Sequence, residues 1–172
     1  MRTTGLRFPL VVLLVTVSIG TNAADEHSSK GSGGWNLYAH DQATAADVGL
    51  PAYPGARPYR ENSETQSSAN LGFSSPAFGI ELVVASFATN DQPERVAEFY
   101  RKALSRYGDV VNCSDPANRK SAKNRDDDLS CDSSDAKKIV YKVGTKKNLH
   151  IVSVETVDEC TRYSMVYIRV RD

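Results

Sequence analysis

Apolar residues recur with helical spacing in residues 92–107, and charged residues fill most of the other positions. The apolar face consists of Val96, Phe99, Tyr100, Ala103 and Tyr107. Such a stripe is typical of a helix that packs one side on a core. Asp91 and Glu94 have the spacing of a capping box at the helix start, and Gly108 is a typical stop. The pattern predicts one amphipathic helix.

Five other segments show the alternation or the short apolar runs of β-strands. They are residues 71–73, 80–88, 138–143, 148–157 and 162–170. Within residues 80–88, Leu82 and Val84 share one face. Val83 and Ala85 share the other face, which predicts a central strand covered on both sides.

The order of these elements indicates the fold class. Strands precede the helix, and short connections of hairpin length join the strands that follow it. We therefore predict an α+β domain in which one main amphipathic helix packs on a mostly antiparallel β-sheet.

The N-terminal residues have the three parts of a secretory signal peptide. Arg2 and Arg7 provide a basic start, residues 8–19 are almost wholly apolar, and small residues follow up to Ala24. The apolar run is shorter than the roughly 20 residues of a membrane span. We expect cleavage after Ala23, which leaves no stable membrane span, and a periplasmic or secreted protein.

The remaining chain divides into two parts by composition. Residues 24–34 are small, polar and Gly-rich, and residues 39–48 favour a short helix that ends at Gly49. The predicted organisation is a signal peptide (1–23), a flexible leader with a short helix (24–49) and a single α+β domain (50–172).

Charge argues against nucleic acid as a partner. The chain has 21 basic and 21 acidic residues; without Arg2 and Arg7 it keeps 19 basic residues, so the net charge is −2. A domain of this balance has no basic surface excess for nucleic acid or anionic membranes.

Three cysteines remain after the expected cleavage, so at most one internal disulfide can form. Cys113 and Cys131 bound one polar loop and are the favoured pair, while pairings with Cys160 stay open. A leftover Cys160 is an inert half-buried residue, a reactive thiol or the link of a disulfide-linked dimer. An exported location favours disulfide formation.

An acidic segment, residues 124–135, has part of the ligand pattern of a calcium loop. Its oxygen-bearing residues Asn124, Asp126, Asp128 and Asp135 stand at loop positions 1, 3, 5 and 12. Leu129 stands where the loop needs Gly for a sharp turn. A solvated acidic turn is favoured over a calcium site.

Candidate catalytic residues do not emerge from the sequence. His27, His40 and His150 are scattered without metal-ligand spacing. The chain contains neither a Gly-rich phosphate loop nor a nucleophile elbow. We assign no catalytic, metal or cofactor residue.

The best candidate for a recognition surface is the Pro- and Tyr-rich segment 50–59. Tyr53, Arg57 and Tyr59 are of types enriched at binding hot spots. The alternative, which the pattern favours, is that Pro54 and Gly55 turn the chain and Tyr53 packs on the core.

Two segments resemble a loose group of uncharacterised exported bacterial proteins. Residues 50–56, LPAYPGA, are similar to a P-x-Y-P-G-A segment of that group. Residues 89–104, TNDQPERVAEFYRKAL, are similar to its D-x-P-x-x-V-x-x-F-Y-x-x-x-L helix. The resemblance implies a small α+β envelope protein and carries over no catalytic residue.

These observations leave three functional hypotheses. The leading one is a non-enzymatic module that binds a protein or an envelope component. The second is an extracytoplasmic hydrolase or thiol enzyme. The third is a secreted inhibitor that inserts its Tyr- and Pro-rich loop into an enzyme cleft.

Overall fold

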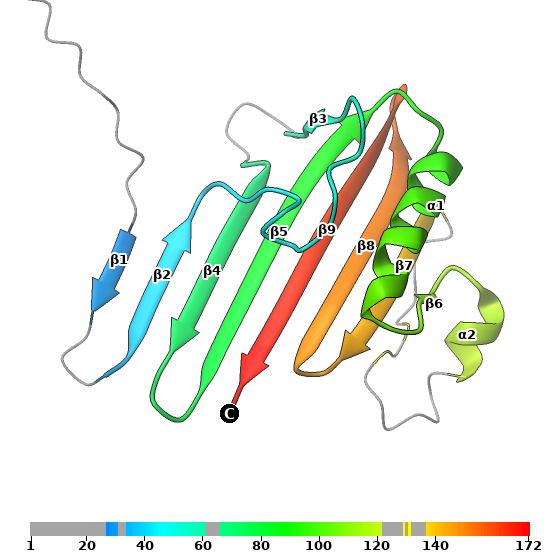
Figure 1. Ribbon diagram of the computed structural model, residues 1–172. Helices are drawn as coiled ribbons and strands as arrows, with labels where there is room; N and C mark the ends of the chain where they lie inside the picture. The colour runs from blue at the N-terminus through cyan, green and yellow to red at the C-terminus, as the bar shows by residue number, and fades with distance from the viewer. Residues whose placement is uncertain (1–26, 31–33, 61–65, 122–128, 130, 132–136) are drawn as a thin grey trace, which may run out of the picture.

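The computed structural model describes residues 27–30, 34–60, 66–121, 129, 131 and 137–172. Within these residues, nine strands form one sheet (Figure 1). The strands are β1 (His27–Lys30), β2 (Asn36–His40), β3 (Arg57–Pro58), β4 (Ser68–Ser74), β5 (Gly79–Thr89), β6 (Val111–Asn112), β7 (Lys138–Thr145), β8 (Asn148–Val157) and β9 (Cys160–Arg171). The helices are α1 (Pro93–Leu104), α2 (Pro116–Ser121) and a 3-10 turn at Ser105–Tyr107.

The sheet is antiparallel throughout. Its strand order is β1-β2-β4-β5-β9-β8-β7-β6, and the short strand β3 pairs with the end of β5. β9 is the last strand of the described residues and lies between β5 and β8. The predicted α+β architecture, an antiparallel sheet with one main helix, is confirmed.

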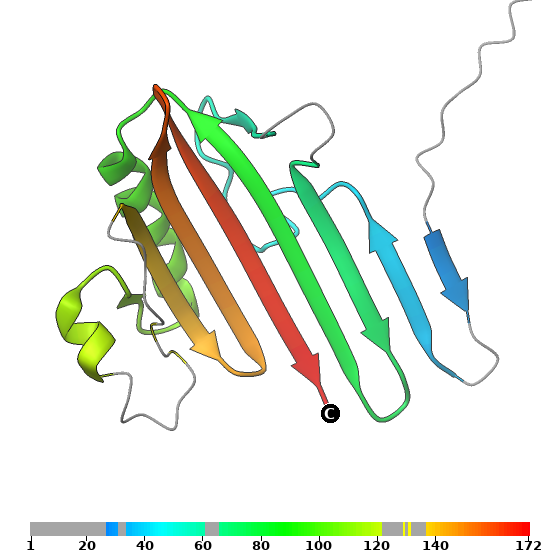
Figure 2. The same cartoon turned by 180° about the vertical axis from the view of Figure 1, so that it is seen from behind.

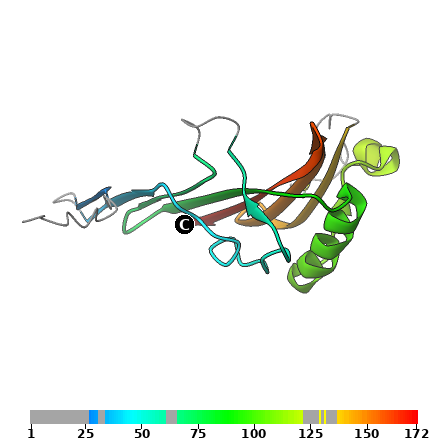
Figure 3. The ribbon, with the colours of Figure 1, turned by 90° about the horizontal axis from the view of Figure 1, so that it is seen from above.

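α1 covers one face of the sheet at β7, β8 and β9 (Figures 1 and 3). Its buried residues are Val96, Ala97, Tyr100 and Leu104. They face inward-pointing residues of the sheet that are fully buried, among them Val83, Val152, Val154 and Met165. Burying this apolar stripe is the main stabilisation of the helix.

The expected capping box does not form. The residue before the helix is Gln92, which makes no side-chain cap, and Pro93 occupies the first turn. Asp91 lies one residue too early and bonds elsewhere, as described below. Pro93 has no N–H that needs a cap and a φ suited to the first turn, so the helix starts without one.

The predicted leader, residues 24–49 with a short helix, differs from the structure in its second half. β1 and β2 form a hairpin that pairs with β4 and extends the sheet. Residues 45–49 form a single turn instead of a helix, spanned by the bond from the Leu50 N–H to the Ala45 carbonyl at 2.8 Å. The partner strand β4 stabilises an extended chain that composition alone does not indicate. The sheet therefore begins well before residue 50.

The second face of the sheet lacks the cover that the apolar pattern predicts. The side chains of Leu82 and Val84 are only half-buried, and α1 and the segment 43–55 both lie on the opposite side (Figures 2 and 3). The prediction that residues 80–88 are covered on both sides is therefore wrong for the described residues.

Cys113 and Cys131 form a disulfide with Cα atoms 5.2 Å apart. The Cys113 N–H donates a 2.8 Å bond to the Val140 carbonyl, which attaches the bridge to β7. Apart from Leu129 and Cys131, the acidic segment 124–135 lies outside the described residues, as does the expected signal peptide. Among the described helices, none is long and apolar enough to cross a membrane.

Candidate functional site

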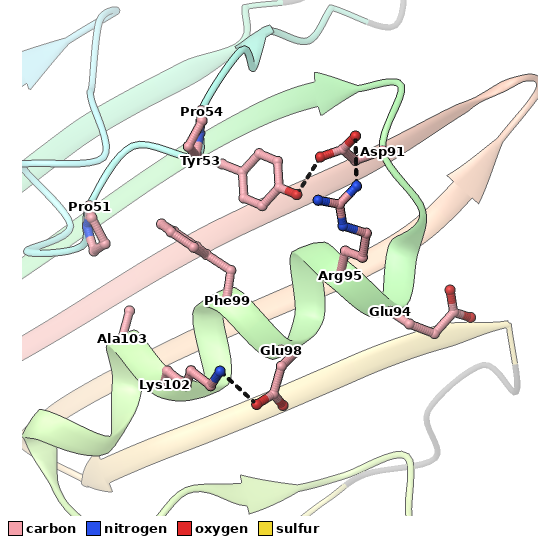
Figure 4. Close-up of a pocket in the computed structure, with 10 residues that line it drawn as sticks. All are labelled: Pro51, Tyr53, Pro54, Asp91, Glu94, Arg95, Glu98, Phe99, Lys102 and Ala103. Carbon is pink, nitrogen blue, oxygen red and sulfur yellow. Dashed lines mark hydrogen bonds and ion pairs between the residues drawn. The ribbon is translucent and has the colours of Figure 1, made fainter.

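A groove of about 910 Å³ runs between α1 and the segment that precedes β3 (Figure 4). The lining residues are Pro51, Tyr53, Pro54, Asp91, Glu94, Arg95, Glu98, Phe99, Lys102 and Ala103. The prolines hold the segment away from a sheet ladder because they lack an N–H donor. The segment therefore runs beside the helix and forms the second wall.

The apolar floor of the groove is an aromatic cluster. The ring of Tyr53 meets the ring of Phe99 edge-on, with centroids 5.1 Å apart. Behind them, the Tyr100 and Tyr163 rings lie 5.1 Å apart. Tyr100 also donates a 3.3 Å hydrogen bond to the Pro51 carbonyl, which ties the helix to the opposite wall. These contacts preform the floor and leave the outer edge of Phe99 open to the groove.

A polar junction closes one end of the groove. The Tyr53 hydroxyl donates a 2.6 Å hydrogen bond to Asp91 Oδ2. Asp91 is fixed in turn by the Thr161 hydroxyl, which donates to its carbonyl at 2.6 Å, and by its own N–H, which donates to Thr89 Oγ1. The bond to the carboxylate raises the pKa of Tyr53. Its phenol therefore stays protonated at neutral pH. The hydrogen bond to Asp91 connects the segment before β3 to the turn that leads into α1.

Charges of both signs line the helix side of the groove, and most of them are paired. Arg95 lies 3.6 Å from Asp91, and Lys102 lies 3.5 Å from Glu98. Arg101 adds a second cation to Glu98 at 2.7 Å. The hydrogen bond from Arg101 lowers the pKa of Glu98 to about 2. The rim therefore offers hydrogen-bonding groups of both signs to a ligand, without one dominant charge.

The size and the lining suit reversible binding. Pockets of about 300–1,000 Å³ with a mostly apolar lining and a few polar groups are typical of small-molecule and cofactor sites. The described residues contain no group of three or more His, Cys, Asp or Glu placed to hold a metal ion.

The structure separates the residues proposed as a recognition surface. Tyr53 is only 8% exposed and belongs to the aromatic floor. Arg57 is exposed in β3, and the Tyr59 ring lies under the Arg162 guanidinium at 5.1 Å. Arg162 belongs to the face of β9 that points away from α1, so the three residues do not form one surface.

Cys160 is the first residue of β9 and lies beside the end of β8, whereas His150 lies near the start of β8. Cys160 is half-buried, and its thiol donates to the Val157 carbonyl at 3.4 Å. Val157 pairs with Cys160, and His150 is seven residues earlier in the strand, about 23 Å away at the strand rise. This distance excludes a Cys160–His150 catalytic pair.

His150 is itself in an unusual place. Its ring is 4% exposed and stacks between the rings of Tyr107 and Tyr167, at 4.0 and 4.6 Å. It hydrogen-bonds to the Val48 backbone, while Nδ1 has no partner among the described residues. Burial lowers the pKa of His150.

Sequence reasoning did not identify the helix side of the groove. Phe99 and Ala103 belong to the apolar stripe, and Lys102 to the charged face, so each has an ordinary explanation in an amphipathic helix. One feature of the sequence points to this side of the groove: Phe99 and Ala103 are four residues apart at the margin of the apolar stripe of α1. Residues at such a margin remain partly open beside a neighbouring segment.

No protein-family model, no curated protein and no solved structure matches this chain.

Proposed function

We propose that this protein is an exported, non-catalytic binding module that holds a peptide segment of a protein partner in the groove beside α1. The observation that carries the proposal is the preformed aromatic floor under a rim of paired charges. Phe99 and Ala103 form a half-buried apolar surface on which one apolar side chain of a bound peptide can pack. Binding energy at protein interfaces concentrates in such anchors.

The charges of the rim favour a peptide over a simple apolar ligand. Arg95 and Lys102 present donors, and Glu94 and Glu98 present acceptors, along one side of the groove. A peptide backbone carries both N–H donors and C=O acceptors, so it can use both kinds of group. A purely apolar ligand would leave them unused.

Export is part of the proposal. It is supported by the signal-peptide pattern of residues 1–23 and by the Cys113–Cys131 disulfide, a bond typical of oxidising compartments. The resemblance of residues 50–56 and 89–104 to exported bacterial proteins adds to this support. A periplasmic or secreted location agrees with all three features.

The other two hypotheses have less support from the geometry. A thiol enzyme would need a base near Cys160, and His150 is about 23 Å away along β8. An inhibitor would need a projecting loop, but Tyr53 is buried in the floor of the groove. The hydrolase version would need a carboxylate free to transfer a proton, whereas Glu98 is held by Arg101 at 2.7 Å and Asp91 by the Tyr53 hydroxyl at 2.6 Å.

The test is selection of displayed peptides on the purified protein, followed by affinity measurement on two variants. Ala103→Trp fills the groove, and Ala117→Trp adds the same side chain at an exposed position of α2. We expect peptides with an apolar anchor whose affinity falls at least about tenfold in Ala103→Trp and stays unchanged in Ala117→Trp. Failure to select any peptide, or equal binding by both variants, would contradict the proposal.

A further inference from the structure

The sheet face that points away from α1 is a continuous apolar surface. The register places Leu71, Leu82, Ile168 and Leu149 side by side in one row across β4, β5, β9 and β8. A second row runs through Phe73 and Ile80. No charged side chain interrupts either run of residues. Within the described residues, no element lies over this surface (Figures 2 and 3).

The side chains of this face are open to solvent to an unusual degree. Leu71 is 44% exposed and Ile80 is 42% exposed, and Leu37 on β2 is 49% exposed. Leu82 and Ile168, at the centre of the row, are shielded only by their neighbours within the sheet. Contiguous apolar surfaces of this kind mark interaction sites.

We propose that this face is the interface of a homodimer, in which the sheets of two copies pack face to face. The apolar area supplies part of what a stable dimer buries. Five strands at about 4.8 Å spacing and six residues at about 3.3 Å rise span roughly 24 by 20 Å. This is about 480 Å², somewhat more than half of the roughly 800 Å² per partner of a stable interface, and the polar rim of the same face would have to supply the rest.

The distribution of charge also suits a second copy. In a two-fold dimer the same surface of both copies is used, so a charge close to the two-fold axis would meet a like charge. At one end of the face, Glu155 is paired with Lys138 at 3.1 Å and with Arg162. The bonded pair Ser86 and Ser164, 2.8 Å apart, separates these ions from the apolar rows. The centre of the face is therefore uncharged, and the charged side chains that the register places on it, such as Lys142 beside Ile151, lie toward its margins.

This dimer is independent of the proposed peptide site. The groove lies on the α1 side of the sheet, and the apolar face lies on the other side (Figure 3). Face-to-face packing leaves both grooves open and directed outward. It is also distinct from a dimer linked through Cys160.

The test is the mass of the exported protein in solution, measured by sedimentation equilibrium on a Cys160→Ser background. This background removes any disulfide link between copies and keeps the Cys113–Cys131 bridge. Leu82→Lys places a charge at the centre of the face, Leu71→Lys places one nearer its margin, and Ala52→Lys adds the same charge at an exposed position on the other side.

We expect the parent and Ala52→Lys to be dimers and both leucine variants to be monomers, with dissociation constants raised at least about 100-fold. Both leucines face solvent in the monomer, so a native circular dichroism spectrum is expected for each variant. A parent that is monomeric at about 50 µM, well above typical dimer constants, would overturn the proposal. So would leucine variants that remain dimeric. Binding of a monomeric parent to phosphatidylcholine vesicles would instead assign the face to lipid.

Discussion

The hydroxyl of Tyr53 donates a 2.6 Å hydrogen bond to Oδ2 of Asp91 and thereby joins two segments that are 38 residues apart in the chain. One segment is the wall of the groove before β3, and the other is the turn that leads into α1. Because Thr161 of β9 holds the Asp91 carbonyl, the wall is fixed to the sheet as well as to the helix. The width of the groove therefore depends on this pair.

Tyr53→Phe should lower the free energy of unfolding by about 1 kcal/mol, because it removes this hydrogen bond and keeps the ring packing. Urea denaturation measures the change. Tyr141→Phe is the control, since Tyr141 is also 8% exposed and its hydroxyl has no partner among the described residues. Equal losses in the two variants would contradict a role for the Asp91 bond.

The same pair should set an alkaline limit of stability. The pKa of Tyr53 is raised in the folded state, so its contribution is fully present below the unfolded value of about 10. It is lost as the pH rises through the folded pKa. Wild type should therefore lose stability above pH ~10 more steeply than Tyr53→Phe. Parallel curves in thermal denaturation would count against this.

His150 should make the protein less stable in mild acid. Its pKa is lowered by burial, so below the unfolded value of about 6.5 the unfolded chain binds a proton that the folded chain does not. Stability therefore falls as the pH drops from about 6.5 toward the folded pKa. The groups that face the ring are Arg106, Tyr107 and Tyr167.

His150→Phe keeps an aromatic ring between Tyr107 and Tyr167 and removes this proton. Its unfolding free energy should be flatter between about pH 7.5 and 5 than that of wild type. If His150→Phe keeps the wild-type slope, another group is responsible.

Replacing both Cys113 and Cys131 by Ser should destabilise the protein by about 3 kcal/mol, because the bridge closes a loop of 18 residues in the unfolded chain. Cys160→Ser should cost less than about 1 kcal/mol, since the thiol makes only a weak bond to the Val157 carbonyl. Guanidinium denaturation of the three proteins gives the comparison. A loss below that of Cys160→Ser would show that the bridge adds nothing to stability.

Gly144→Ala should cost more than Gly55→Ala, although both glycines have positive φ, 115° and 72°. A Cβ at position 144 would lie 2.0 Å from the Asn148 backbone oxygen in the β7–β8 hairpin, whereas at position 55 no atom lies within 4 Å. Backbone strain alone should lower the free energy of unfolding by about 1 kcal/mol in Gly55→Ala. The clash should raise this loss above about 2 kcal/mol in Gly144→Ala. Equal melting temperatures would contradict this.

Local patterns were sufficient to predict α1, the strands that follow it and the antiparallel class. The stripe of Val96 and Tyr100 and the alternation of Tyr163 and Met165 are properties of neighbouring residues, and burial follows from them directly. The structure also contains the bridge favoured from the spacing of Cys113 and Cys131.

Features that depend on distant partners could not be predicted. Asp91 has the spacing of a helix cap, but its partner Tyr53 is 38 residues away. The composition of residues 36–40 does not indicate a strand, because β2 is stabilised by its pairing with β4, which is distant in the sequence. The groove exists because the Pro51 carbonyl accepts a bond from Tyr100, and no periodicity in either segment encodes that contact.

The central place of β9 has a consequence for the timing of folding. Cys160–Arg171 pairs with β5 on one side and with β8 on the other, so β1–β5 and β6–β8 have no direct hydrogen-bonded link to each other. In a chain that emerges from a ribosome or a translocation channel in N-to-C order, these two parts cannot join until β9 has appeared. Under the proposed export, the sheet therefore stays incomplete while the residues before Cys160 cross the channel.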